Sequence, residues 1–354
     1  MKRNLSMWHH ARVNWRRLAR LIGLWSLFLI IAVYVLWPWL PGTGAAPART
    51  VVVYGFSILG EVMNEGIFPA FQAEWEAKTG ERVEFISAFA GSGTITNQII
   101  MGVPAEIAIL SLELDANRLV AEGTLPGPTW RELPYGGVVN RTPFIIQVRP
   151  SNPLSITDFA DLTQPDVGIV HPDPLTSGGA QWAILAEYGA ALRQSGDQTA
   201  AKNQLLGIWQ NVVAQSSSAR GARTQFDNGF GDALITYEQE PLRDQALGKL
   251  NADIVYPSST ILSEHIVVVL DKNVPDADQE LVQAFVDFLW SEEAQNIFVN
   301  YGFRSVNDAL NQNNPQFGTI ADPFTVADLG GWPTAKQEII DGVWKQQVLT
   351  ELGK

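Results

Sequence analysis

The chain of 354 residues carries 37 Asp and Glu against 24 Lys and Arg, a formal net charge of −13, and it has no cysteine. The lack of cysteine excludes disulfides, cysteine-based metal sites, thiol catalysis and the acylated N-terminal cysteine of a lipoprotein. Residues 1–50 hold seven of the bases and no acid, so the rest of the chain has 17 bases and 37 acids, a net charge of −20. Such an acidic body disfavours nucleic acid as a partner, because nucleic-acid sites need a basic face.

The N-terminus has the pattern of a membrane segment. Residues 21–40 are an uncharged run of 20 residues rich in Leu, Ile, Val and Trp, long enough at about 1.5 Å per residue to cross a hydrocarbon core of about 30 Å. The basic residues 1–20 predict a cytoplasmic start and an exported body. We expect a retained transmembrane anchor at 21–40 with a tether at 41–50. A signal peptide that is cut at Gly44-Ala45-Ala46 is the alternative.

Strands and helices alternate at the start of the folded body. A β-branched run predicts a strand over Arg49–Gly55, and a helical pattern follows over Glu61–Thr79, with Gly80 as its stop. The next expected elements are strands and a helix over Val83–Ser87, Ile107–Leu110 and Leu114–Glu122. Alternation of this kind is typical of an open α/β sheet.

Two long extended stretches, Val138–Arg149 and Ile254–Leu270, divide the body. The first can carry the chain from one lobe to a second, and the other can bring it back. Between them lie further strand and helix patterns over Val167–His171, Gln204–Val213 and Asp232–Tyr237, and after them a long helix over Leu281–Tyr301. The two crossings predict a two-strand hinge between lobe 1 (51–140 and 265–354) and lobe 2 (141–264).

Several stretches of small residues can hold an anion. Thr176-Ser177-Gly178-Gly179-Ala180 comes directly before a helical run, so a hydroxyl and free N–H groups meet the positive end of a helix dipole. Ala90-Gly91-Ser92-Gly93-Thr94 repeats the pattern, with another hydroxyl before a second amphipathic run. A small-residue turn over Ser216–Ala222 and a glycine turn that enters a strand over Gly229–Tyr237 follow. Taken alone, each stretch also fits an ordinary loop.

Together, these landmarks resemble the extracytoplasmic sulfate-binding proteins of ABC uptake systems. The matching segments, in order, are Gly91-Ser92-Gly93, Thr176–Ala180 with Trp182, Ser218–Gly221, Gly231–Ile235, Ile261–Glu264, Asp271–Val274 and Gly330–Trp332. The resemblance implies an α/β, type II periplasmic-binding-protein fold of two α/β lobes, with the ligand in the cleft between them. It also implies that neutral donors hold a bound dianion, at Ser92, Ser177, Gly178, Gly179, Ala219 and Tyr237.

Three positions depart from the family pattern. The family usually has an indole in the place of Tyr237, and it has an Asp-Pro-Thr-like turn where this chain has Gly55-Phe56-Ser57-Ile58. Thr94 stands where a lysine is common. The resemblance implies sulfate or thiosulfate as the ligand, and because of these departures molybdate, phosphate or a sulfonate are alternatives.

The expected function is that of an extracytoplasmic receptor, tethered to the membrane, that captures the oxyanion by hinge closure and delivers it to an ABC permease. A sensor of the same fold that docks on another protein is the alternative. We expect no enzymatic activity, cofactor or metal. Asp232 and Glu238 could form a carboxylate pair, but we expect them to be solvated or paired with Arg220 or Arg223. His265 lies in an apolar run and is expected to pack or hydrogen-bond in the core.

Overall fold

The structure, a computed structural model, describes residues 15–36, 48–312 and 314–353. The chain falls into two units, Met1–Ala48 and Arg49–Lys354. The second unit contains the α/β sheet and the candidate site.

The described part of the N-terminal unit is one helix, α1 (Trp15–Leu36). Its large apolar side chains from Leu24 to Leu36 are exposed. Residues 37–40 of the expected anchor lie outside the described residues, as do 41–47, which include the alternative cleavage site. Within the described ranges, no helix is both long and apolar enough to cross a membrane.

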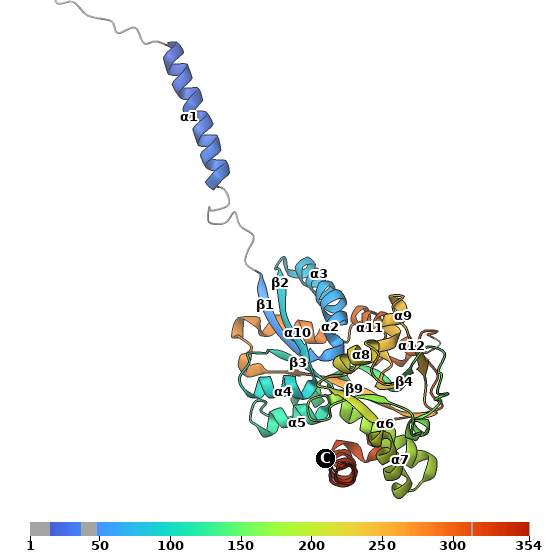
Figure 1. The fold of residues 1–354 in the computed structure, drawn as a ribbon. Coiled ribbons are helices and arrows are strands. Elements are labelled where there is room, and N and C mark those ends of the chain that lie inside the picture. The colour runs from blue at the N-terminus through green and yellow to red at the C-terminus, as the bar shows by residue number, and fades with distance from the viewer. Residues whose placement is uncertain (1–14, 37–47, 313, 354) are drawn as a thin grey trace, which may run out of the picture. The chain divides into compact units, whose positions relative to one another are not determined.

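Three parallel strands form the first part of the sheet (Figure 1). β1 (Arg49–Phe56) pairs with β2 (Val83–Ala90) on one side and with β3 (Ile107–Leu110) on the other, in the expected alternation with helices. The expected helix over Glu61–Thr79 is less regular than predicted, because short 3-10 and π-helical turns precede its main part. The elements are a 3-10 turn (Ser57–Leu59), α2 (Gly60–Val62), a π-helical turn (Met63–Ile67), α3 (Phe68–Thr79), α4 (Ser92–Ile100) and α5 (Glu113–Ala121).

Two long strands, β4 (Val138–Val148) and β9 (Ser259–Val269), lie in the middle of the sheet and pair antiparallel. β9 also pairs with β3, and β4 also pairs with β7 (Ala233–Tyr237) and β8 (Asp253–Val255). The strand order is β2-β1-β3-β9-β4-β7-β5-β6. The two strands thus join the part around β1–β3, here called the first region (49–137), to the part around β5–β8, the second region (149–258).

The second region alternates strands with longer helices. β5 (Ile169–Pro172) is parallel to both β6 (Val212–Ser216) and β7. The helices are α6 (Gly178–Ser195), α7 (Gln198–Gln210), α8 (Ala219–Asp227) and α9 (Gln239–Ala246). The expected helix over Gln204–Val213 ends early, because the chain enters β6 at Val212.

The prediction of a single helix over Leu281–Tyr301 is wrong in one respect, because the structure has two helices there. α10 (Gln279–Phe288) ends before Ser291, and the Ser291 hydroxyl accepts a hydrogen bond from the backbone N–H of Ala294 at 3.1 Å. A serine in this position caps a helix start, and α11 (Glu292–Asn300) begins there. The chain continues into α12 (Asp308–Asn311) and β10 (Asp322–Phe324), which is parallel to β9.

The last segment packs against the second region. It consists of α13 (Gly331–Thr334), a π-helical stretch (Ala335–Val348) and α14 (Leu349–Glu351). The rings of Trp344 and Trp209 on α7 lie 5.1 Å apart, and those of Trp332 and Trp182 on α6 lie 4.6 Å apart. The last segment, which the sequence analysis groups with 51–140, thus contacts α6 and α7.

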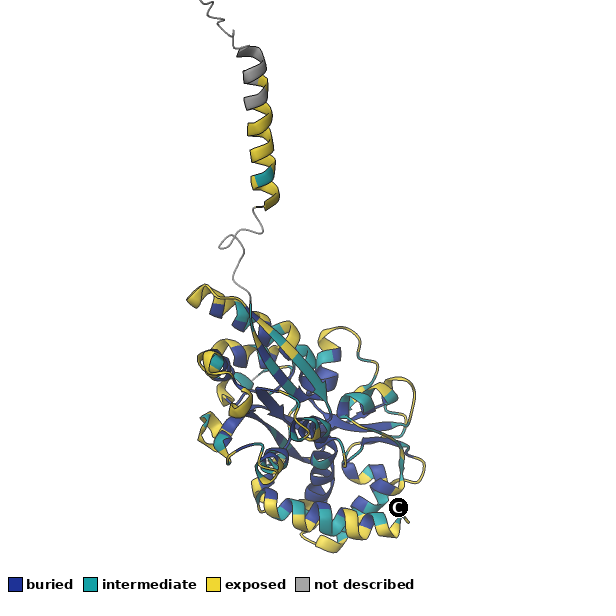
Figure 2. Cartoon of the chain, turned by 90° about the vertical axis from the view of Figure 1, so that its left-hand side faces the viewer, coloured by how far each residue is buried: buried dark blue, intermediate teal, exposed yellow. Residues whose placement is uncertain are grey.

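Buried residues follow the sheet through both regions, as the colours of Figure 2 show. α6 is buried along most of its length, because its many Ala and Gly residues allow close packing. At Gly189, for example, a Cβ atom would come within 2.5 Å of the Phe324 ring.

The remaining short 3-10 turns are Thr129–Glu132, Pro134–Gly137, Phe159–Thr163, Asp271–Asn273, Asp276–Asp278 and Val326–Leu329.

Candidate anion-binding site

The starts of three helices, α4, α6 and α8, meet at Gly91. A Cβ atom at Gly91 would lie 2.5 Å from the carbonyl oxygen of Ser217, and nearer still to that of Thr176. Thr176 precedes α6 and Ser217 precedes α8, so only glycine allows the start of α4 to reach both. The first N–H groups of a helix have no hydrogen-bond partner within the helix. Three helix starts that meet can therefore offer backbone N–H donors to an anion.

Ser92 is buried, and its hydroxyl is already engaged. Its Oγ donates to Asp115 Oδ2 at 2.6 Å and accepts from the backbone N–H of Ser111 at 3.1 Å. Burial raises the pKa of Asp115, and the hydrogen bond from Ser92 opposes that rise. Because a hydroxyl has a single proton, Ser92 can offer an anion its backbone N–H but not the hydroxyl expected from the sequence.

Ser177 stands immediately before α6 and is 3% exposed. Its side chain makes no capping hydrogen bond with the helix. Gly178 and Gly179 are both closely approached: a Cβ atom at Gly178 would lie 2.7 Å from Ser111 Oγ, and one at Gly179 would lie 2.9 Å from the Tyr237 ring. The first residues of this 18-residue helix, Gly178 and Gly179, therefore lie beside Ser111 and Tyr237.

Tyr237 ends β7 and is fully buried. Its hydroxyl lies 2.9 Å from Ser111 Oγ, and its ring packs at 4.5 Å from Phe144 and 5.5 Å from His265. Burial raises the pKa of Tyr237, so the phenol stays neutral. The residue is thus a core side chain whose polar tip reaches the start of α6.

The start of α8 is built from neutral groups. The Ser218 hydroxyl caps the helix by accepting from the backbone N–H of Gly221 at 3.1 Å, and Ala219 is buried beside it. The backbone N–H of Arg220 points to Ser57 Oγ at 3.5 Å. Ser57 belongs to the turn after β1 that departs from the family pattern, and sequence reasoning did not select it.

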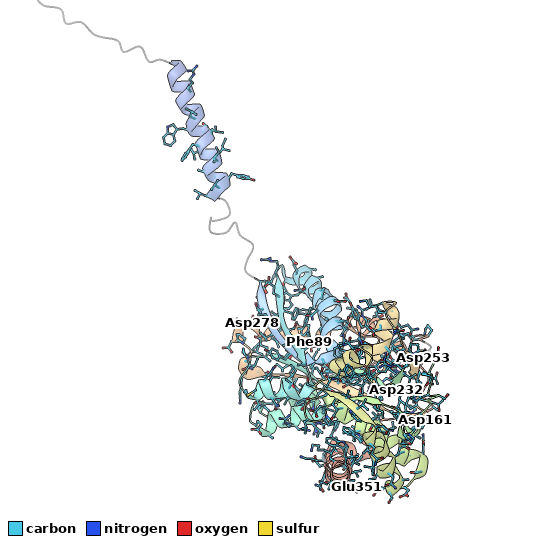
Figure 3. All side chains as sticks on the ribbon, viewed as in Figure 1. Phe89, Asp161, Asp232, Asp253, Asp278 and Glu351 are labelled. Carbon is cyan, nitrogen blue, oxygen red and sulfur yellow. The ribbon has the colours of Figure 1, made fainter. Side chains whose placement is uncertain are left out.

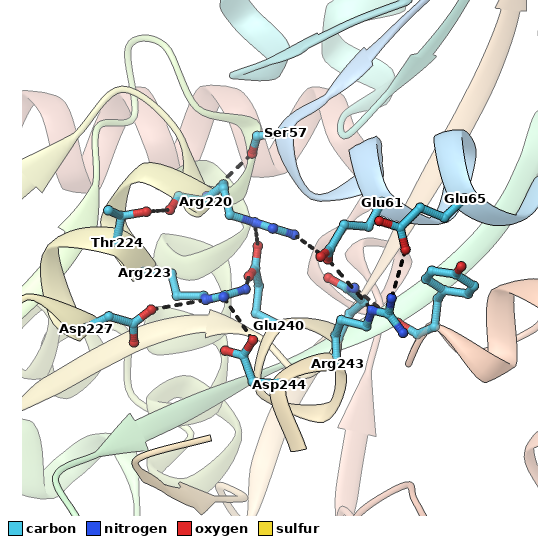
Figure 4. Close-up of polar contacts among 12 residues, drawn as sticks. Ser57, Glu61, Glu65, Arg220, Arg223, Thr224, Asp227, Glu240, Arg243 and Asp244 are labelled. Carbon is cyan, nitrogen blue, oxygen red and sulfur yellow. Dashed lines mark hydrogen bonds and ion pairs between the residues drawn. The ribbon is translucent and has the colours of Figure 1, made fainter. Parts of the chain in front are cut away.

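The cationic side chains near α8 are paired with carboxylates, as Figure 4 shows. Arg220 lies 2.9 Å from Glu240 and 3.5 Å from Glu61, and Arg243 lies 3.0 Å from Glu65 and 3.8 Å from Glu61. We call Glu61, Glu65, Arg220 and Arg243 the ion bridge, because they join the first region to the second.

Arg223, on the same helix, pairs within the second region, with Glu240 at 2.5 Å and Asp244 at 2.9 Å. Asp232 and Glu238 were expected to be solvated or paired with Arg220 or Arg223, and this is wrong for Glu238, which is fully buried and pairs with another arginine, whereas Asp232 is partly exposed. Glu238 binds Arg304 through two hydrogen bonds of 2.8 Å, and Asp232, labelled in Figure 3, accepts from the backbone N–H of Gly168.

His265 packs in the core, as expected from its apolar run. It is fully buried, with Nδ1 2.6 Å from Asn140 Oδ1 and its ring 4.4 Å from Phe56. Burial lowers the pKa of His265 to about 3, so the ring is neutral at physiological pH. In the part of the chain that the structure describes, no three His, Cys, Asp or Glu residues are grouped to hold a metal ion.

The chain belongs to the bacterial extracellular solute-binding protein family, whose model matches residues 60–304. Members of this family bind solutes and are not enzymes, so the chain is an extracytoplasmic binding protein. The resemblance inferred from the sequence motifs is thereby confirmed.

Individual relatives agree with this assignment. A sulfate-binding protein of Synechococcus elongatus is 34% identical over 315 residues, 87% of this chain and 88% of its own length. A thiosulfate-binding protein of Pseudomonas aeruginosa is 29% identical and covers 85% of this chain and 92% of its own length. The solved structure of the sulfate-binding protein SubI from Mycobacterium tuberculosis superposes with a TM-score of 0.75 at 27% identity, over 82% of this chain and 99% of its own length. The body therefore has the α/β fold of a periplasmic binding protein.

Proposed function

We propose that this protein captures sulfate or thiosulfate outside the cytoplasm for uptake by an ABC transporter. The observation that carries the proposal is the meeting of three helix starts at Gly91, while Arg220, Arg223 and Arg243 are all paired with carboxylates. The similar proteins that are named for sulfate and thiosulfate support the choice of ligand.

The proposed donors are neutral. They are the Ser177 hydroxyl, the Tyr237 hydroxyl and the backbone N–H groups of Ser92, Gly178, Gly179 and Ala219. Hydrogen bonds to a charged partner are stronger than those between neutral groups, and a site from which water is excluded strengthens them further. A fully ionised oxyanion needs donors only, and the four backbone N–H groups cannot accept the proton of hydrogen phosphate, so these amides favour sulfate. The hydroxyls of Ser177 and Tyr237 can accept as well as donate, so they do not add to this selectivity.

The proposed motion is a hinge between the two regions at β4 and β9. In this proposal lobe 1 is built on 51–140 and 265–330 and lobe 2 on 141–264. The last segment, from Gly331, moves with lobe 2 because it packs on α6 and α7. An anion bound at the start of α6 would recruit α4 from the other lobe. The closed form would then be the one that the permease recognises.

A ligand panel tests the proposal directly. Thermal unfolding of the full chain would be followed with sulfate, thiosulfate, molybdate, phosphate and a sulfonate. A ligand at about 1,000 times its Kd stabilises a protein by about 4 kcal/mol, so sulfate or thiosulfate should give the largest rise in melting temperature. An equal small rise with every salt would contradict specific capture.

Membrane attachment is a separate proposal that rests on the sequence of residues 1–40, with their basic flank and apolar run. The native membrane fraction would be washed with salt, and the N-terminus of the retained protein would be sequenced. We expect the chain to stay in the membrane fraction with residues 21–40 intact. Release by salt, with a new N-terminus near Ala46, would show a cleaved signal peptide instead.

A further inference from the structure

Ser111 contacts three of the six candidate donor residues, Ser92, Gly178 and Tyr237, although no sequence motif pointed to it. It follows β3 directly and is 1% exposed. Its backbone N–H donates to Ser92 Oγ at 3.1 Å, its carbonyl oxygen accepts from Trp182 Nε1 at 2.7 Å, and its Oγ lies 2.9 Å from the Tyr237 hydroxyl. Every polar group of this one residue is therefore engaged at the site.

These contacts join the two regions of the fold. Ser92 and Ser111 lie in the first region, whereas Trp182 on α6 and Tyr237 on β7 lie in the second. Ser111 Oγ is also 2.7 Å from the position that a Cβ atom of Gly178 would occupy. The side chain thus lies between the first turn of α6 and the hydroxyl of Tyr237, and its contacts with both depend on how the regions meet.

The hydroxyl pair leaves one proton free. Ser111 and Tyr237 have two hydroxyl protons, and either atom can be the donor of the single hydrogen bond between them. The second proton can then be donated to another group. Both oxygens are buried, so loss of one hydroxyl leaves the other without its partner, which costs more than replacing both by apolar groups.

We infer that Ser111 is a positioning residue of the anion site, whose hydroxyl holds the Tyr237 hydroxyl so that the pair presents one proton to the anion. The inference rests on the proposed function. It adds a hydrogen bond between the first and second regions, from Ser111 to Tyr237, that forms when the two regions close to complete the site. The neutral state of Tyr237 fits this role, because a phenolate would repel the anion.

The test is a double-mutant cycle on the full chain, in which sulfate binding is measured by titration calorimetry for wild type, Ser111→Ala, Tyr237→Phe and the double variant. We expect each single substitution to raise the Kd by about tenfold, the size of one hydrogen bond to a charged group. The double variant should be no weaker than the weaker single variant, because both changes remove the same hydrogen bond. Ser111→Cys, which keeps a weak donor, should fall between wild type and Ser111→Ala.

Ser305→Ala is the matched control, because Ser305 is an equally buried serine that bonds Gln295 at 2.6 Å away from the site. It should lower the melting temperature and leave the Kd unchanged. Unchanged sulfate binding in Ser111→Ala, or single effects that multiply in the double variant, would overturn the inference. A wild-type chain that binds neither sulfate nor thiosulfate would instead contradict the proposed function, and the inference with it.

Discussion

Helix α8 contacts the first region in two places that differ in chemistry. At its start, neutral groups meet: the Ser218 cap, buried Ala219, and the backbone N–H of Arg220 beside Ser57. Along its side, the charged ion bridge joins the Arg220 guanidinium to Glu61. The backbone N–H of Arg220 therefore belongs to the neutral contact at the start of α8, and its guanidinium belongs to the ion bridge.

This difference shows how an acidic body can hold an anion. With a net charge of −20 after residue 50, the body repels a dianion at long range. The guanidinium of Arg220 is compensated by Glu240 and Glu61, so attraction must come from short hydrogen bonds at the helix starts. The affinity for the anion should therefore depend on the geometry of the neutral donors at the helix starts. Any effect of added salt on this affinity should come from the ion bridge.

The largest loss of anion affinity is expected for Gly91→Ala. The added methyl group would collide with two backbone carbonyl oxygens, of Thr176 and Ser217, which cannot rotate away as a side chain can. Overpacking costs about 1–3 kcal/mol, so the Kd for sulfate should rise by up to about a hundredfold. Titration calorimetry would measure it, with Gly127→Ala as the control because a Cβ atom there meets nothing within 4 Å. Equal affinities in the two variants would refute the convergence at Gly91.

A smaller loss is expected for Ser177→Ala and for Gly178→Ala. The first removes a buried hydroxyl donor, and the second places a methyl group against Ser111 Oγ at the start of α6. Each should raise the Kd by about tenfold, the worth of one hydrogen bond to a charged group. Ser195→Ala is the control on the same helix, because its hydroxyl bonds Ala191 at the far end. If both variants bind sulfate like the wild type, the site assignment falls.

The ion bridge should contribute less, and its contribution should depend on salt. Glu61→Gln removes the carboxylate that faces both Arg220 and Arg243. Partly exposed ion pairs contribute little, so the Kd should rise by about threefold at low ionic strength and the difference should fade as salt is added. Asp227→Asn is the matched control, since Asp227 pairs with Arg223 on the same helix at 3.3 Å. A loss in Glu61→Gln that persists at high salt would argue against an electrostatic bridge.

The smallest effect on affinity is expected from pH, which should act on stability instead. Burial holds the pKa of His265 at about 3, whereas the unfolded ring titrates near its ordinary value of 6.5. Below that value the unfolded state binds a proton that the folded state does not, so stability falls as the pH drops from about 6.5 toward 3, at most by about 1.4 kcal/mol per pH unit for this group.

Urea unfolding of the wild type and His265→Gln at neutral pH and near pH 4.5 would isolate this contribution. The variant should lose less stability than the wild type on acidification. An identical loss in both proteins would show that the neutral His265 ring does not contribute.

Local patterns in the sequence predicted much of the fold. The β-branched run at Val51–Val53 lies in β1, and the long extended stretches became β4 and β9, because strand formation depends on side-chain patterns that a short window contains. The long helix over Leu281–Tyr301 was misjudged, since its apolar period continues through the Ser291 cap. The packing of the last segment could not be predicted from local patterns, because it depends on Trp332 and Trp344 meeting distant helices.

The residues of the candidate site likewise fall into those that the sequence could predict and those that it could not. The glycines and serines at the helix starts carry a local signal, and Ser92, Ser177, Gly178 and Gly179 could be selected from it, whereas Ala219 and Tyr237 came from the family resemblance. Ser111 and Ser57 could not, since their partners Tyr237 and Arg220 lie 126 and 163 residues away in the chain. The position of Ser111 directly after a buried parallel strand was the one available hint, because ligands gather at the carboxyl ends of such strands.

The most direct test of the neutral-donor site is a titration of the full chain with sulfate at two ionic strengths, about 20 and about 200 mM sodium chloride, which change the Debye length about threefold. A site of short, desolvated hydrogen bonds predicts saturable binding of a single sulfate per chain, with a Kd that changes by less than about threefold between the two conditions. Absence of saturable binding, or a Kd that weakens tenfold or more with added salt, would contradict a site built from neutral donors.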